Sequence, residues 1–118
     1  MLVTNNYQPN FKGLKFNAMY NSSVEKEVKD IFYSKLPKEE VDKFFSTLRK
    51  SPIETTLGLA DSKTGARLDA TVYYKKPLTG DEIFKYIEEK KLANLFNIKP
   101  TKFVERVLKC VESFEKKI

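Results

Sequence analysis

The sequence predicts a small two-layer α+β domain, with a three-stranded antiparallel sheet and about four helices on one face of it. Residues 14–20 and two segments between 53 and 74 alternate apolar and polar residues, a period of two that is typical of half-buried strands. Other segments repeat apolar residues at helical spacing. The chain has 118 residues, 41% of them hydrophobic and 32% charged, which favours one folded unit.

The first half of the chain reads as an arm, a strand and two helices. Residues 1–10 are polar and without periodicity, so we expect a flexible N-terminal arm ahead of a single domain over 11–118. In the first strand Leu14, Phe16, Ala18 and Tyr20 share one face. Ser22 and Glu25 have the spacing of a capping box, which predicts a helix start there. A second helix is expected after Pro37, because proline suits a first helical turn but not the interior.

The middle of the chain predicts a β-hairpin whose register follows from hydrophobic patterning. The apolar residues are odd-numbered in the first strand and even-numbered in the second. Both sets lie on the same face only if each odd-numbered residue pairs with an even-numbered one, so that the residue numbers of cross-strand partners add up to an odd number. The predicted pairs are Leu59 with Leu68, Leu57 with Ala70, Thr55 with Val72 and Ile53 with Tyr74. They leave residues 62–65 as the loop.

The last third predicts helices. Pro77 ends the second hairpin strand, and Thr79 with Glu82 repeats the capping-box spacing, so we expect a helix from about Gly80 with Ile83, Tyr86 and Ile87 on one face. The apolar phase changes near residues 90–91, which predicts a kink or a new helix. A last helix is expected after Pro100. The complete predicted order is β-α-α-β-β-α-α.

The charge pattern gives weak information about partners. The net charge is +6, but the basic excess is spread along the chain, and no segment forms a basic tail or a polybasic membrane anchor. Of 22 basic residues only three are arginine, namely Arg49, Arg67 and Arg106. Because arginine is the better bidentate reader of bases and phosphates, this composition disfavours specific base readout.

Residue types that often act in catalysis, such as histidine and cysteine, are absent or rare in this chain. The chain has no histidine and one cysteine. Cys110 lies near the apolar stripe of the last predicted helix, has no histidine base, and is interpreted as structural. No spacing predicts a metal or cofactor site, so we expect no enzyme activity and no cofactor. A lone cysteine, a polar N-terminus and no long apolar run favour an intracellular, cytoplasmic protein that does not contact membranes.

The polar face of the predicted sheet is the candidate binding surface. It carries residue types that stack on bases, grip phosphate or bind a protein partner. The candidate residues are Lys15, Asn17, Arg67, Thr71 and Tyr73. We expect a non-enzymatic interaction domain that binds another protein through this face, a sheet edge or the arm. Two alternatives stay open: a nucleic-acid-binding module using the same face, and a small enzyme that depends on carboxylates or lysine.

Overall fold

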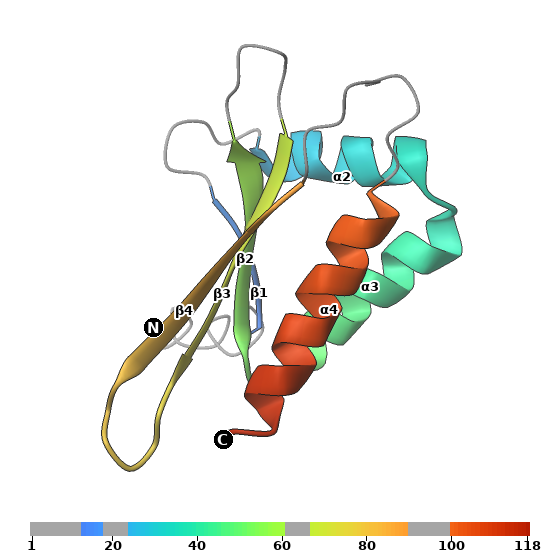
Figure 1. The fold of residues 1–118 in the computed structure, drawn as a ribbon. Helices are drawn as coiled ribbons and strands as arrows, with labels where there is room; N and C mark the ends of the chain where they lie inside the picture. The colour runs from blue at the N-terminus through green and yellow to red at the C-terminus, as the bar shows by residue number, and fades with distance from the viewer. Residues whose placement is uncertain (1–12, 18–23, 61–66, 90–99) are drawn as a thin grey trace, which may run out of the picture.

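The computed structural model describes residues 13–17, 24–60, 67–89 and 100–118. These residues form a four-stranded mixed sheet, in the spatial order β1-β2-β3-β4, with three helices on one of its faces (Figure 1). The predicted α+β class is therefore confirmed. The elements are β1 (Leu14–Phe16), α2 (Val24–Lys35), α3 (Lys38–Lys50), β2 (Glu54–Ala60), β3 (Arg67–Lys75), β4 (Glu82–Glu88) and α4 (Thr101–Glu115).

The first strand corrects the prediction of a wholly antiparallel sheet. β1 pairs in parallel with β2, with Leu14 opposite Thr55 and Phe16 opposite Leu57. The chain leaves β1, passes through α2 and α3, and returns to begin β2 at the same end of the sheet. Two helices supply the long crossover that a parallel pair needs, whereas a tight turn joins only antiparallel strands.

The hairpin register is confirmed for three of the four predicted pairs. β2 and β3 are antiparallel, and the ladder contains Leu59 with Leu68, Leu57 with Ala70 and Thr55 with Val72. Ile53 lies just before β2 and is outside the ladder, although its side chain is buried. The predicted loop, residues 62–65, lies outside the described residues.

The helix predicted from Gly80 is wrong over residues 82–88. These residues form β4, which is antiparallel to β3, with Tyr73 opposite Phe84 and Thr71 opposite Tyr86. The hydroxyl of Thr79 accepts a hydrogen bond from the Asp81 backbone N–H (3.2 Å), so it closes the β3–β4 turn and caps no helix. Over the described ranges the sheet therefore has four strands where three were predicted.

About four helices were predicted, and the described part of the chain contains three. The predicted kink and helix near residues 90–96 lie outside the described residues, as do the N-terminal arm and the Ser22 cap. No helix in the described ranges is long and apolar enough to cross a membrane.

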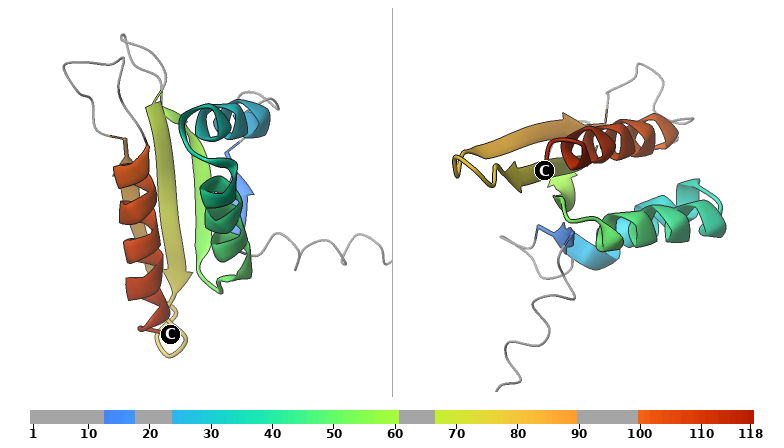
Figure 2. Two further views of the ribbon diagram at one scale, coloured as in Figure 1. Left: turned by 90° about the vertical axis from the view of Figure 1, so that its right-hand side faces the viewer. Right: turned by 90° about the horizontal axis from the view of Figure 1, so that it is seen from below.

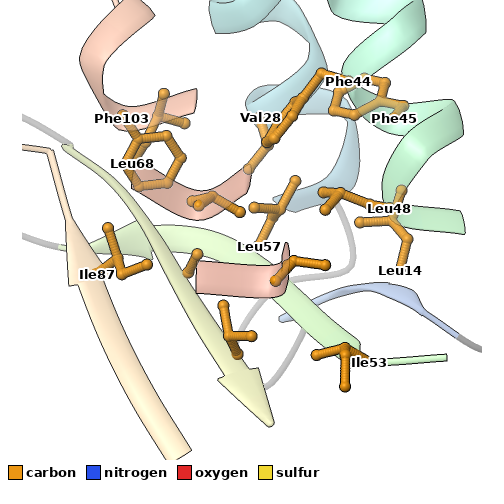
Figure 3. Close-up of a cluster of buried hydrophobic side chains, with 14 of the residues drawn as sticks. Leu14, Val28, Phe44, Phe45, Leu48, Ile53, Leu57, Leu68, Ile87 and Phe103 are labelled. Atoms are coloured by element: carbon orange, nitrogen blue, oxygen red, sulfur yellow. The ribbon is translucent and has the colours of Figure 1, made fainter. Parts of the chain in front are cut away.

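The core lies between the sheet and the helices (Figure 3). In Figure 2, α2 and α3 cover the β1–β2 side of the sheet, and α4 covers β3 and β4. Phe32 of α2 is fully buried and its ring packs against Phe44 and Phe45 of α3 and Phe103 of α4. All three helices thus share one core.

Candidate functional site

The face of the sheet opposite the helices, here called the open face, has no helix over it in the described structure (Figure 2). The ladders bring residues from four strands onto it. The described side chains of the open face are Lys15, Asn17, Glu54, Thr56, Asp69, Thr71, Tyr73, Lys75, Glu82, Phe84, Tyr86 and Glu88. The predicted polar outer face therefore exists, and β4 enlarges it.

Three aromatic side chains lie together on the open face. Tyr73 of β3 packs against Phe84 of β4, with ring centroids 4.8 Å apart and an interplanar angle of 39°. Tyr86 lies two residues further along β4. Phe84 is 62% exposed and Tyr86 is 53% exposed. Neighbouring exposed rings of this kind are a feature of surfaces that bind other molecules.

Carboxylates surround these rings and hold the two tyrosines. The Tyr86 hydroxyl lies 3.0 Å from Asp69 Oδ2 and 2.9 Å from Glu88 Oε2, so two acids compete for one phenolic proton. The Tyr73 hydroxyl donates to Glu82 Oε1 at 3.1 Å. These bonds fix the ring orientations and turn the carboxylates toward the aromatic cluster.

Burial perturbs the titration of this group of residues. Burial raises the pKa of the Asp69 carboxyl, and the nearby charge of Glu88 raises it further. The hydrogen bond from Tyr86 acts in the opposite direction and lowers this pKa, but its effect is smaller than that of burial. Burial is also the largest cause that raises the pKa of the Tyr86 phenol, followed by its bonds to Glu88 and Asp69. Both effects keep protons on the open face to higher pH than in free side chains.

Gly58 of β2 makes room for Asp69. A Cβ at Gly58 would lie 2.9 Å from Asp69 Oδ1 and 3.1 Å from Asn17 Cβ, closer than side chains normally approach. Because Gly58 has no side chain, the Asp69 carboxylate can lie over β2, and Asp69 Oδ2 can accept the hydrogen bond from the Tyr86 hydroxyl. A glycine inside a strand often marks such a close approach.

Four of the five predicted residues, Lys15, Asn17, Thr71 and Tyr73, lie on this face. Lys15 forms an ion pair with Glu54 at 2.6 Å, and Asn17 follows β1 and donates its backbone N–H to the Leu57 carbonyl (2.8 Å). Thr71 and Tyr73 are half-buried in β3, in register with Tyr86 and Phe84. Arg67 begins β3 opposite Ala60, and its side chain lies outside what the structure describes.

The residues that sequence reasoning missed all belong to β4. Phe84 and Tyr86 alternate with Ile83 and Ile87, and this segment is rich in the β-branched and aromatic residues that favour strands. That composition was the available signal. The capping-box spacing at Thr79 and the apolar residues at 83, 86 and 87 favoured a helix instead.

The open face is acidic, although the chain is basic. It carries four described carboxylates, those of Glu54, Asp69, Glu82 and Glu88, against two described lysines, Lys15 and Lys75. One of these lysines is already paired with Glu54. The described side chains of the open face therefore include more acidic than basic groups, whereas the whole chain has a net charge of +6.

Other candidate chemistry is weaker. Cys110 is half-buried against the core, and burial raises the pKa of its thiol, which favours the unreactive protonated form. Among the described residues, no group of three or more cysteine, aspartate or glutamate side chains is placed to hold a metal ion. A hollow between α3 and α4 is lined by Glu40, Lys43 and Glu105 together with two threonines and apolar residues.

Comparison with protein-family models, with curated proteins and with solved structures found no match to this chain.

Proposed function

We propose that the protein is a binding domain whose open face receives a basic surface of another protein. The observation that carries this proposal is the cluster of half-buried Tyr73 with exposed Phe84 and Tyr86, which carboxylates flank on the sheet. Aromatic residues are enriched in the centres of protein interfaces, where their large rigid surfaces bury apolar area at low entropy cost.

The charge of the open face supports a basic partner. The carboxylates of Asp69, Glu82 and Glu88 lie beside the rings, and the nearby lysines are fewer. Arginine or lysine side chains of a partner would pair with these carboxylates and stack over the rings as cations. Complementary charge of this kind steers association and fixes the orientation of the bound protein.

Binding of single-stranded nucleic acid is the second candidate, because three aromatic rings on an open sheet also suit base stacking. It ranks lower because carboxylates lie against these rings. Nucleic-acid affinity comes largely from neutralising phosphates with lysine and arginine, and Lys15, one of the nearby cations, is paired with Glu54. The carboxylates next to Tyr86 would instead repel a phosphate backbone.

The test is a photo-crosslinker placed on the open face. p-Benzoylphenylalanine at Tyr73, an inner-strand position, should crosslink a protein in the native cell. The same label at Tyr33, an exposed ring on α2, is the matched control and should not capture that protein. A crosslink to nucleic acid at Tyr73, or an identical product from both positions, would contradict the proposal.

Defined probes separate the two candidates in vitro. A peptide of alternating arginine and leucine should shift the backbone amide NMR signals of Tyr73, Phe84 and Tyr86, and Glu82→Gln should weaken its binding several-fold. Oligothymidine should leave these signals unchanged at low salt. The reverse result, shifts with oligothymidine that disappear as salt is added, would favour the nucleic-acid function.

A further inference from the structure

Within the described residues, the outer edge of β4 presents backbone groups that no other strand pairs. Lys76 donates its N–H to the Asp81 carbonyl (2.8 Å), and Glu89 donates to the Leu68 carbonyl (2.9 Å). In an antiparallel ladder alternate residues bond to the same neighbour, so the odd-numbered residues of β4 bond to β3. The even-numbered residues Glu82, Phe84 and Tyr86 therefore point their N–H and C=O groups outward, where the described chain has no strand.

Among the described residues, this edge lacks most of the usual protection, and the only protective feature it carries is charged side chains, Lys85 among them. β4 is seven residues long, contains neither proline nor glycine, and keeps an unbroken register with β3. β1, at the opposite edge, is only three residues long. Proteins commonly protect sheet edges by short strands, prolines, bulges or charged side chains. β4 has only the charged side chains, so its backbone remains regular and able to pair with another strand.

We propose that the protein forms a homodimer in which the β4 strands of two copies pair antiparallel about a two-fold axis at Phe84. Phe84 then lies opposite Phe84 of the second copy, Glu82 lies opposite Tyr86, and Ile83 lies opposite Lys85. The result is one continuous eight-stranded sheet with both open faces on the same side. This inference goes beyond the proposed function, since it concerns the sheet edge rather than the open face.

Charge and hydrogen bonding select this register. An axis at Lys85 would place Lys85 opposite its own copy and Glu82 opposite Glu88, and like charges directly opposite are destabilising. An axis at Tyr86 would require the outward carbonyl of Glu88 for the ladder. That carbonyl already accepts a hydrogen bond from Arg106 Nη1 at 2.8 Å, so the ladder would need its second lone pair. An axis at Phe84 needs only the outward groups of residues 82, 84 and 86 and avoids both conflicts.

The same register covers the most exposed ring of the open face. Phe84 is 62% exposed, and its neighbour Tyr73 lies 4.8 Å away by ring centroid. Pairing at Phe84 would form a row of four rings across the two copies, from Tyr73 of one to Tyr73 of the other. Cross-strand aromatic pairs of this kind stabilise antiparallel ladders.

The helix layer leaves room for this pairing. α4 packs against both β3 and β4, so its axis lies between them. With strands about 4.8 Å apart, the α4 helices of two copies would lie roughly 10 Å apart, which is an ordinary helix-packing distance. The second copy therefore adds a helix contact behind the new strand pair.

Sedimentation velocity of the full chain from micromolar to millimolar concentration tests the dimer. A dimer is expected, and Phe84→Lys should weaken it by about tenfold or more, because two like charges then meet at the axis. Tyr73→Lys is the matched control: it adds the same charge to an inner strand of the same face and should weaken the dimer less. A monomer at every concentration would overturn the proposal, as would a dimer equally sensitive to both changes.

Disulfide crosslinking tests the register. In a Cys110→Ser background, Phe84→Cys should link two copies on oxidation, because Cα atoms of a hydrogen-bonded antiparallel pair lie about 5.5 Å apart, within disulfide range. Lys85→Cys and Tyr86→Cys report the two other registers and should not link. Efficient linking at 85 or 86 and not at 84 would overturn the proposed axis, and Phe84 is exposed enough for these variants to fold.

Discussion

Asp69 shows how one carboxyl can connect stability to the open face. It is half-buried, its Oδ1 lies over Gly58, and its Oδ2 accepts the Tyr86 hydroxyl hydrogen. Burial raises the pKa of this carboxyl above the value of 3.8 for a free aspartate. The folded state therefore keeps the proton to higher pH than the unfolded state does.

The raised pKa of Asp69 determines the direction in which the stability of the protein changes with pH. Because the folded protein binds more protons, the Asp69 contribution to the free energy of unfolding falls as pH rises from about 3.8 through the folded pKa. Asp69→Asn removes the buried charge and keeps an acceptor for Tyr86. The Tm of Asp69→Asn relative to the natural protein should therefore increase between pH 4 and pH 7.

Thermal unfolding at these two pH values measures the difference. Asp81→Asn, which changes an exposed carboxyl in the β3–β4 turn, is the matched control for the loss of one negative charge. A constant difference between Asp69→Asn and the natural protein across this range would contradict the assigned pKa shift.

Gly58 has the complementary role on β2. Gly58→Ala would push a methyl group against Asp69 and Asn17, and it should lower the free energy of unfolding by about 1–3 kcal/mol. Thr56→Ala, on the same strand and face, removes atoms without a clash and should cost less. Urea denaturation of the two variants gives the comparison.

At the scale of elements, the junction of β1 with α3 depends on Gly13. Its φ of +100° lies in the left-handed region, and a Cβ there would clash with the Leu48 carbonyl oxygen and lie 2.7 Å from that of Ser51. Gly13→Ala should therefore cost about 3 kcal/mol or more, from strain and clash together. Gly80→Ala, at φ +78° in open space, should cost only the backbone strain, about 1–2 kcal/mol.

If chemical denaturation gave equal losses for both glycine variants, the contact of β1 with the end of α3 would not matter for stability.

The elements also show what the sequence could predict. The β2–β3 register was predictable because hydrophobic alternation leaves one pairing that buries both apolar sets. α2, α3 and α4 were predictable from their apolar stripes. β4 was not, because Ile83, Tyr86 and Ile87 fit a helical face as well as a strand, and the Thr79 hydroxyl serves a turn as readily as a helix cap.

Part of the open face was predictable from the alternation of apolar and polar residues in its strands. Lys15, Thr71 and Tyr73 face outward because their strands alternate, and that alternation is visible in the sequence. Phe84 and Tyr86 join them only through β3–β4 pairing, a contact that local patterns cannot establish. The parallel placement of β1 likewise depends on the path through α2 and α3, which periodicity does not reveal.

At the scale of the whole molecule, Ser51 connects the two parts of the helix layer. Ser51 follows α3, is buried, donates its hydroxyl hydrogen to Glu115 Oε2 of α4 (2.6 Å) and accepts the Ile53 N–H (3.1 Å). Ser51→Ala leaves the Ile53 N–H without this partner and should cost about 1–3 kcal/mol. Ser113→Ala, on the exposed side of α4, should be nearly neutral, and thermal unfolding compares the two.

The parallel pairing of β1 has a kinetic consequence. Leu14 meets Thr55 only after more than three dozen intervening residues have been arranged, whereas β2, β3 and β4 follow one another through short connections. Closing a long loop costs conformational entropy before any contact compensates for it. The antiparallel strands β2, β3 and β4 should therefore assemble first, and β1 should pair last. Native-state hydrogen exchange measures this order. The Asn17 amide, which bonds to the Leu57 carbonyl, should exchange faster than the Glu89 amide, which bonds to the Leu68 carbonyl. The protein should therefore begin to open at its first strand.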